Sequence, residues 1–310
     1  MRVGLIDVDG HNFPNTALMR LSSYHKAKGD SVEWWWGFDH YDIVYMSRVF
    51  NDSYSEDLPE PANADIVIKG GSGYAIDTIH GIEVYDKDRD PCLPKGAECI
   101  MPDYSLYPEY TKNRAYGSLT KGCPKKCPWC HVCAMQGTET KQICELSDFR
   151  TDQHYVTLSD PNLLAAPNRE DLLLSLRDAK VAVDFNQGLD IQRMDEDVIG
   201  ILNSMRGTTY HFAWDDPSID LTDQFAFVGA RMRVKAIKRR MTYVLTNFAG
   251  SGVDDTLWRI ETLRGLSFDP FVMIYNKPEA NQELHDLQRW CNNKFLFNSC
   301  TFDEYKEESK

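Results

Sequence analysis

The chain has 310 residues, of which 42% are hydrophobic and 26% are charged, and its formal net charge is −13. This hydrophobic content is enough for a real core, which excludes a disordered protein, and the length suits one large or two ordinary domains. The acidic balance argues against a protein that wraps nucleic acid by bulk electrostatics, because phosphate contacts need clustered Lys and Arg. No run of about 18 apolar residues exists, and the N-terminus enters a strand-like pattern directly, so we expect a cytoplasmic protein that does not enter a membrane.

Residues 1–75 alternate predicted strands with a helix. The strands are expected at 3–8, 32–36, 43–46 and 66–68, and the helix at 15–28. This order predicts an open parallel sheet, a Rossmann-like α/β domain. Ligands in such folds bind beyond the carboxyl ends of the strands. Polar or glycine residues follow those strands, so we expect them on one rim of the sheet: Asp9, His11, Ser47, Gly70 and Gly71.

Residues 76–114 are rich in proline and mixed charge and predict an extended connector. The nine cysteines of the chain are an odd number and no secretory signal precedes them, so they do not indicate a disulfide framework. An auxiliary metal cluster remains open for the cysteines that lie outside the closely spaced triplet: Cys92, Cys99, Cys133, Cys144, Cys291 and Cys300.

Between residues 115 and 290, strands and helices alternate with regular length. Strands are predicted at 115–120, 155–159, 181–185, 208–214, 241–245 and 271–275, and helices at 169–179, 196–204, 221–237, 253–266 and 281–290. Residues 291–310 form a C-terminal extension. Polar residues that directly follow the strands are candidates for gripping a cofactor, or else turn formers and helix caps: Asp160, Asn162, Gln187, Asp215 and Asn247.

One basic segment interrupts the acidic composition, from Arg231 to Arg240. Its two interpretations are the solvated face of a helix, which we favour, and a phosphate-binding patch.

The most informative stretch is Cys123-Pro124-Lys125-Lys126-Cys127-Pro128-Trp129-Cys130. Closely spaced cysteines indicate a soft metal or a cluster, because a positive centre holds the thiolate form. The prolines disfavour a helix here, so we expect a loop. Since iron–sulfur cubanes usually take four cysteines, three would leave one iron open to a ligand that is not protein. The alternative is a zinc site that adds His131 or Cys133, in a zinc-stabilised binding module.

The C-x3-C-x2-C spacing of Cys123, Cys127 and Cys130, with Trp129 before the last cysteine, resembles the signature of the radical SAM superfamily. The resemblance implies a [4Fe–4S] cluster on the three thiolates, S-adenosylmethionine on the fourth iron, and Trp129 beside the adenine. It implies reductive cleavage of S-adenosylmethionine to a 5′-deoxyadenosyl radical that takes hydrogen from a substrate. It also implies oxygen sensitivity and a one-electron donor of flavodoxin or ferredoxin type.

The same resemblance implies that the strands and helices that alternate over 115–290 form a (βα)6 partial barrel. It also implies that five strand-end residues lie near the cosubstrate: Asp160, Asn162, Gln187, Asp215 and Asn247. The family's GGE element is absent, and Ser159-Asp160-Pro161-Asn162 stands in its place. The substrate is not identified; a peptide and a nucleic acid both remain open.

The N-terminal layout loosely resembles the cobalamin-binding domain of one branch of the family. Asp9-Gly10-His11 matches the start of a D-x-H-x-x-G motif, although Pro14 occupies the place of its glycine. On this alternative, a cobalamin-dependent methyltransferase, His11 ligates cobalt, and Asp9, Ser47, Gly70 and Gly71 belong to the same site.

Overall fold

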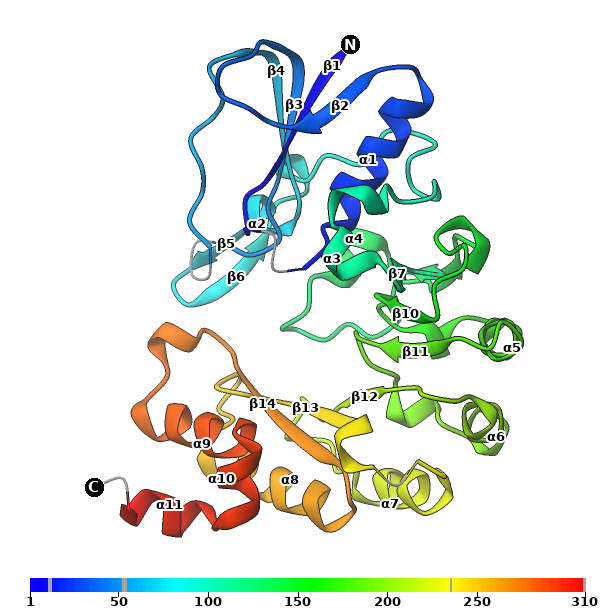
Figure 1. The fold of residues 1–310 in the computed structure, drawn as a ribbon. Helices are drawn as coiled ribbons and strands as arrows, with labels where there is room; N and C mark the ends of the chain where they lie inside the picture. The colour runs from blue at the N-terminus through cyan, green and yellow to red at the C-terminus, as the bar shows by residue number, and fades with distance from the viewer. Residues whose placement is uncertain (11–12, 52–54, 235, 309–310) are drawn as a thin grey trace. The chain divides into compact units, whose positions relative to one another are not determined.

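The structure is a computed structural model that describes residues 1–10, 13–51, 55–234 and 236–308 (Figure 1). His11 therefore lies outside the described residues. The chain forms two compact units, Met1–Thr157 and Leu158–Lys310. The predicted α/β class with parallel sheets is confirmed. In the part of the chain that the structure describes, no helix is both long and apolar enough to cross a bilayer.

The first unit is built on a four-stranded parallel sheet in the order β2-β1-β3-β4. Its elements are β1 (Arg2–Asp7), α1 (Thr16–Ala27), β2 (Ser31–Trp34), β3 (Tyr41–Ser47) and β4 (Ala64–Gly70). The chain moves outward in one direction from β1 to β2 and in the other from β3 to β4. The sheet therefore reverses its strand order between β1 and β3.

Both faces of this sheet are apolar, as expected when side chains alternate along a strand. Leu5 and Tyr45 lie side by side in the register and pack with Leu18 and Leu21 of α1. Ile6 and Met46 lie on the opposite face. Helix α1 begins at an Asn15 cap, whose side chain accepts a hydrogen bond from the Leu18 N–H.

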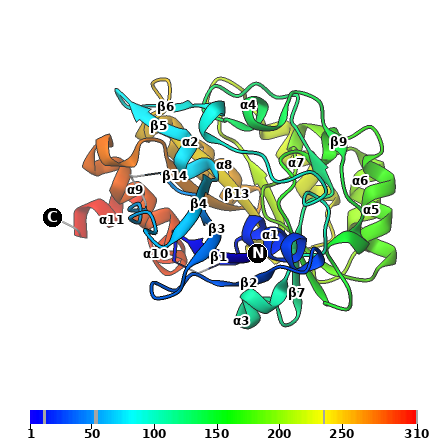
Figure 2. The same ribbon diagram turned by 90° about the horizontal axis from the view of Figure 1, so that it is seen from above.

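The remainder of the first unit consists of short elements. They are α2 (Ser72–Ala75), β5 (Ile76–Ile79), β6 (Ile82–Tyr85), α3 (Pro108–Thr111), β7 (Arg114–Gly117), β8 (Thr120–Lys121), α4 (Val132–Gln136) and β9 (Lys141–Gln142). The predicted extended connector thus contains an antiparallel hairpin, β5–β6, directly after α2 (Figure 2).

The structure joins Cys99 and Cys144 in a disulfide, contrary to our expectation that the cysteines form none. Sequence spacing could not reveal this pair, because its members are 45 residues apart and meet only through folding. In this state neither thiol is available to an auxiliary cluster.

Strand β10 (Tyr155–Leu158) contains the boundary between the units. The second unit continues with α5 (Arg169–Asp178), β11 (Ala182–Phe185), α6 (Glu196–Ser204), β12 (Tyr210–Ala213), α7 (Thr222–Arg231), β13 (Arg240–Thr246), α8 (Val253–Gly265), β14 (Asp269–Ile274), α9 (Gln282–Asn292), α10 (Lys294–Ser299) and α11 (Phe302–Glu308). Strands β12, β13 and β14 are parallel neighbours, and a parallel bridge from Asp184 to Thr209 places β11 beside the start of β12.

Helices α5 to α8 follow one another along one side of these strands (Figure 1). Their shared core with the sheet is strongly aromatic and includes Phe212, Trp214, Phe225 and Phe268, all buried. A second cluster packs β14 against α8 and α9, around Trp290.

The helix predicted over 221–237 is shorter than expected and ends at Arg231. After it, the backbone N–H of Arg233 donates to Asn203 Oδ1, and Arg240 is buried with its guanidinium over the Phe268 ring. Arg231 itself pairs with Glu196. The basic segment is therefore not one continuous helix face, because tertiary contacts use several of its cations.

The packing predicts opposite effects for two glycine-to-alanine substitutions. Gly200 lies exposed within α6, and no atom would contact an added Cβ. Gly200→Ala should raise the free energy of unfolding by about 0.5–1 kcal/mol, because glycine loses more backbone entropy in a helix. A Cβ on Gly117 would overlap the buried Phe149 ring. Gly117→Ala should cost about 1–3 kcal/mol. Urea denaturation of both variants checks the signs; equal shifts would contradict this packing.

Candidate functional site

The three closely spaced cysteines lie on a loop that is closed at its base. Thr120 and Lys121 of β8 pair antiparallel with Gln142 and Lys141 of β9. Above this ladder the Cys123 N–H donates to the Gly137 carbonyl over 3.1 Å. The Thr140 hydroxyl donates to the Gly122 carbonyl over 3.0 Å. The loop was predicted from the prolines, whereas the ladder that closes it was not.

Gly122 is the residue on which this closure depends. Its φ is +83°, in the left-handed region, and an added Cβ would overlap the Glu139 carbonyl oxygen. Its N–H also donates to the Gln136 side chain at the end of α4 over 3.3 Å. A larger residue would open the base of the loop directly before Cys123.

The donor set fits a thiolate-bound metal cluster. Cys123 and Cys127 are half-buried, Cys130 is exposed, and none of the three is in a disulfide. From Gly122 to Thr138 the loop carries Lys125 and Lys126 and no Asp or Glu. Cysteine thiols on a short loop are ligands that soft metals and iron–sulfur clusters take.

The two residues offered as a fourth zinc ligand have other partners. The Cys133 thiol lies 3.1 Å from the Cys123 carbonyl oxygen and 2.7 Å from that of Lys125, and donates its S–H there. Burial raises the pKa of the Cys133 thiol, and the nearby Cys123 adds to this. His131 Nε2 lies 3.4 Å from a Glu83 carboxylate oxygen. Cys133 is thus a neutral hydrogen-bond donor in this arrangement.

Among the described residues, Cys99, Cys144 and Asp148 bring three ligand atoms within 4.8 Å of one another. In the structure Cys99 and Cys144 are bonded to each other.

The rim residues of the first unit do meet at the carboxyl ends of the strands. The Asp9 carboxylate accepts from the Val49 N–H at 2.6 Å and from the Phe50 N–H at 3.4 Å. The Asn15 side-chain amide donates to the Ser47 hydroxyl over 2.9 Å. These bonds hold the loops after β1 and β3 together.

Gly70 and Gly71 lie on the same rim, and an added Cβ at Gly71 would overlap the Arg48 carbonyl oxygen. Its φ of +101° also requires glycine. Packing between loops therefore accounts for this glycine. Asp9 and Ser47 are engaged as described, His11 lies outside the described residues, and we derive no step through cobalamin.

In the second unit, three of the predicted strand-end residues form hydrogen bonds with the end of a neighbouring strand or its loop. The Asn162 side-chain amide donates to Asp190 over 3.3 Å, the Asp215 carboxylate accepts from the Leu245 N–H at 3.1 Å, and the Asn247 side chain donates to the Tyr275 carbonyl over 2.8 Å. Each of these three hydrogen bonds joins segments that are 28 to 30 residues apart in the sequence.

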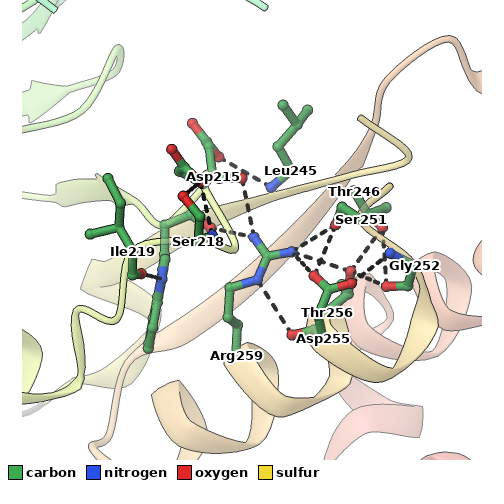
Figure 3. A network of polar contacts seen from close by, with 12 residues as sticks. Asp215, Ser218, Ile219, Leu245, Thr246, Ser251, Gly252, Asp255, Thr256 and Arg259 are labelled. Carbon is green, nitrogen blue, oxygen red and sulfur yellow. Dashed lines mark hydrogen bonds and ion pairs between the residues drawn. The ribbon is translucent and has the colours of Figure 1, made fainter. Parts of the chain in front are cut away.

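A buried arginine supports the same strand ends (Figure 3). Arg259 of α8 is fully buried and donates to the Trp214 carbonyl over 2.7 Å. It also donates to Asp255 at 2.7 Å and to the Ser251 hydroxyl at 3.1 Å. The guanidinium thereby fixes the backbone on which Asp215 sits.

The remaining candidates differ in exposure. Asp160 is only 4% exposed, Gln187 is exposed, and Trp129 is half-buried. Gln187 is therefore the most accessible of the strand-end candidates.

Sequence reasoning missed a polar network that crosses the neighbouring strands β11, β12 and β13. Asp184 of β11, His211 of β12 and Tyr243 of β13 lie on the face opposite the helices, each on the next strand. His211 Nδ1 is 2.7 Å from the Tyr243 hydroxyl, and its Nε2 is 3.3 Å from an Asp184 carboxylate oxygen. A histidine within the otherwise apolar run Tyr210–Ala213 was the available signal.

Burial sets the protonation of this network. It lowers the pKa of His211, and the Asp184 charge offsets only part of this. Burial, aided by the same charge, raises the pKa of Tyr243 to about 12. Near neutral pH the imidazole and the phenol are therefore both uncharged.

No protein-family model and no curated protein matches the sequence. Two solved structures of SuiB from Streptococcus suis are similar to part of the chain at 11% identity. SuiB bound to S-adenosylmethionine has a TM-score of 0.32 and matches 46% of this chain and 34% of its own. SuiB bound to precursor peptide SuiA has a TM-score of 0.33, with 46% and 35% covered. The match thus spans about a third of SuiB, and at these TM-scores it assigns no function.

The lowered pKa of His211 predicts how stability depends on pH. Below the ordinary value of 6.5 the unfolded chain binds a proton that folded His211 resists. Stability should therefore be full above pH 6.5 and fall as the pH drops, by at most about 1.4 kcal/mol per pH unit from this group. Urea denaturation at pH 7.5 and 5.5 should show a smaller difference for His211→Gln than for the wild type. The exposed His154→Gln is the control. An unchanged pH difference in His211→Gln would refute the assignment.

Proposed function

We propose that this protein is a radical SAM enzyme, with residues 115–290 as its core. The observation that carries the proposal is a closed loop in which Cys123, Cys127 and Cys130 match the family spacing while Cys133 is engaged in backbone hydrogen bonds. Three cysteine ligands leave one iron of a cubane for a small molecule. When bound, a [4Fe–4S] cluster with S-adenosylmethionine would supply the reductive cleavage that starts radical chemistry.

The chain's own residues supply binding and orientation. The loop ladder and Gly122 hold the three thiols on one short segment. Lys125 and Lys126 lower the cost of the thiolate charge, and Trp129 provides a flat surface beside the last cysteine. Asp160, Asn162, Gln187, Asp215 and Asn247 are the proposed cosubstrate residues, and Gln187 has the most accessible side chain of the five.

Two parts of the proposal concern partners. A one-electron donor of flavodoxin or ferredoxin type must reduce the enzyme. Exposure of Cys130, one of the proposed cluster ligands, supports access for such a donor. The substrate class stays open between a peptide and a nucleic acid.

Cysteine variants separate the cluster from a zinc site. After anaerobic reconstitution, the wild type should hold about four irons, as a cubane requires. Serine at Cys123, Cys127 or Cys130 should abolish the brown colour and most of the iron. Cys133→Ser should retain the iron, because Cys133 is a hydrogen-bond donor rather than a ligand. Iron content and absorbance provide the measurement. One tightly bound zinc per chain, lost also in Cys133→Ser, would establish the zinc-stabilised module instead.

The reaction is tested by product formation. Reconstituted protein with dithionite and S-adenosylmethionine should release 5′-deoxyadenosine and methionine, measured by liquid chromatography, and Cys127→Ser should release neither. If the protein binds four irons but yields no 5′-deoxyadenosine, the result would support the cluster and refute the proposed reaction. S-Adenosylhomocysteine as the product, with a bound corrinoid, would favour the methyltransferase.

A further inference from the structure

The first unit contains a cavity of about 570 Å³ at the carboxyl edge of its sheet. Its walls come from the ends of β3 and β4, the first turns of α1, the segment from Asp90 to Pro94, and the end of α4. The strand order reverses between β1 and β3. Open parallel sheets bind ligands at such a reversal.

The lining is mostly apolar with a few polar groups. Leu18, Leu21, Tyr45 and Ile68 form part of the apolar wall, and Asn15 and Ser47 add polar atoms. Drug-sized ligands occupy pockets of about 300–1,000 Å³ with this kind of lining.

Charge narrows the ligand class. Among the described residues that line the cavity, no side chain is Lys, Arg or His, and Asp90 is the sole formal charge. Phosphate groups need cationic partners or a helix terminus with unsatisfied N–H groups. At α1 the Asn15 cap already accepts from the Leu18 N–H.

The glycines on the rim give no phosphate cradle either. An added Cβ at Gly73 would overlap the Phe50 carbonyl oxygen, as one at Gly71 would overlap that of Arg48. At Gly70 it would lie 3.4 Å from the Pro91 ring. These glycines let two loops and the proline segment pack closely around the cavity.

We propose that this cavity binds an uncharged small molecule with a largely apolar surface and no phosphate. The site is separate from the cysteine triplet but connected to it. Met135 and Gln136 of α4 line the cavity, and the Gln136 side chain accepts the Gly122 N–H directly before Cys123. This proposal does not depend on the radical SAM assignment.

A matched pair of fluorescent probes tests the charge preference on the full chain. Dansylamide is neutral, and 5-(dimethylamino)naphthalene-1-sulfonate carries the same ring system with a negative charge. Dansylamide should bind saturably at one site per chain, and the sulfonate at least tenfold more weakly. Asp90→Asn should narrow that difference. Equal binding of the two probes to the wild type would overturn the proposed selectivity.

Two alanines of α1 provide the variants. Ala17 lines the cavity, whereas Ala27 lies exposed at the end of the same helix. Ala17→Phe should fill the space and weaken dansylamide at least tenfold, and Ala27→Phe should leave its affinity unchanged. Equal affinities in two folded variants would place the probe elsewhere.

Cys92 gives a readout that needs no substitution. It lines the cavity, is exposed, and is the only cysteine between Arg89 and Lys95, so trypsin releases it on its own peptide. Bound dansylamide should slow alkylation of Cys92 by N-ethylmaleimide at least fivefold, measured by mass spectrometry, with Cys300 as the internal control. Unchanged alkylation at saturating dansylamide would refute the site even if Ala17→Phe does not fold.

Discussion

The close approach of the Glu139 carbonyl to Gly122 is the contact on which the cysteine loop depends. A side chain at this position would both overlap that oxygen and strain a left-handed backbone. With glycine there, the β8–β9 ladder can end two residues before Cys123, and the Cys123 N–H can bond to the Gly137 carbonyl on the returning side of the loop. The three thiols are thus confined to a segment whose ends are fixed. Preorganisation of this kind reduces the conformational entropy that the loop loses when it binds a group.

Hydrogen bonds between loops likewise hold the strand ends of the second unit. A parallel sheet leaves N–H and carbonyl groups at its edge that need partners. The Asp215 carboxylate accepts from the Leu245 N–H, and the Asn247 side chain donates to the Tyr275 carbonyl. Arg259 of α8 donates to the Trp214 carbonyl. A residue type that suits a ligand also suits these backbone groups. Polar residues after strands therefore have a structural role here whether or not they also bind a ligand.

Sequence periodicity predicted correctly those helices whose ends are set by residues nearby in the sequence. The helix expected at 196–204 is α6, which begins after Asp195, whose side chain accepts from the Val198 N–H. The helix expected at 221–237 failed beyond Arg231, because Asn203 and Phe268 engage the following residues and neither is near in sequence. The octet from Cys123 to Cys130 was recognisable because its three cysteines are close together in the chain. The network of Asp184, His211 and Tyr243 was not, because strand register brings these residues together.

That network also distinguishes the two faces of the second sheet. Toward the helices, Phe212 and Val244 are fully buried and form an apolar core. On the other face, Asp184 keeps 29% of its side chain exposed beside the more buried imidazole. A carboxylate inside a sheet needs water or a polar neighbour. The His211 imidazole lies beside Asp184 on one side, and the remaining exposure leaves part of this side chain accessible to water. The exposed part of Asp184 thus lies on the face of the sheet away from the helices, where water reaches it without disturbing the apolar core.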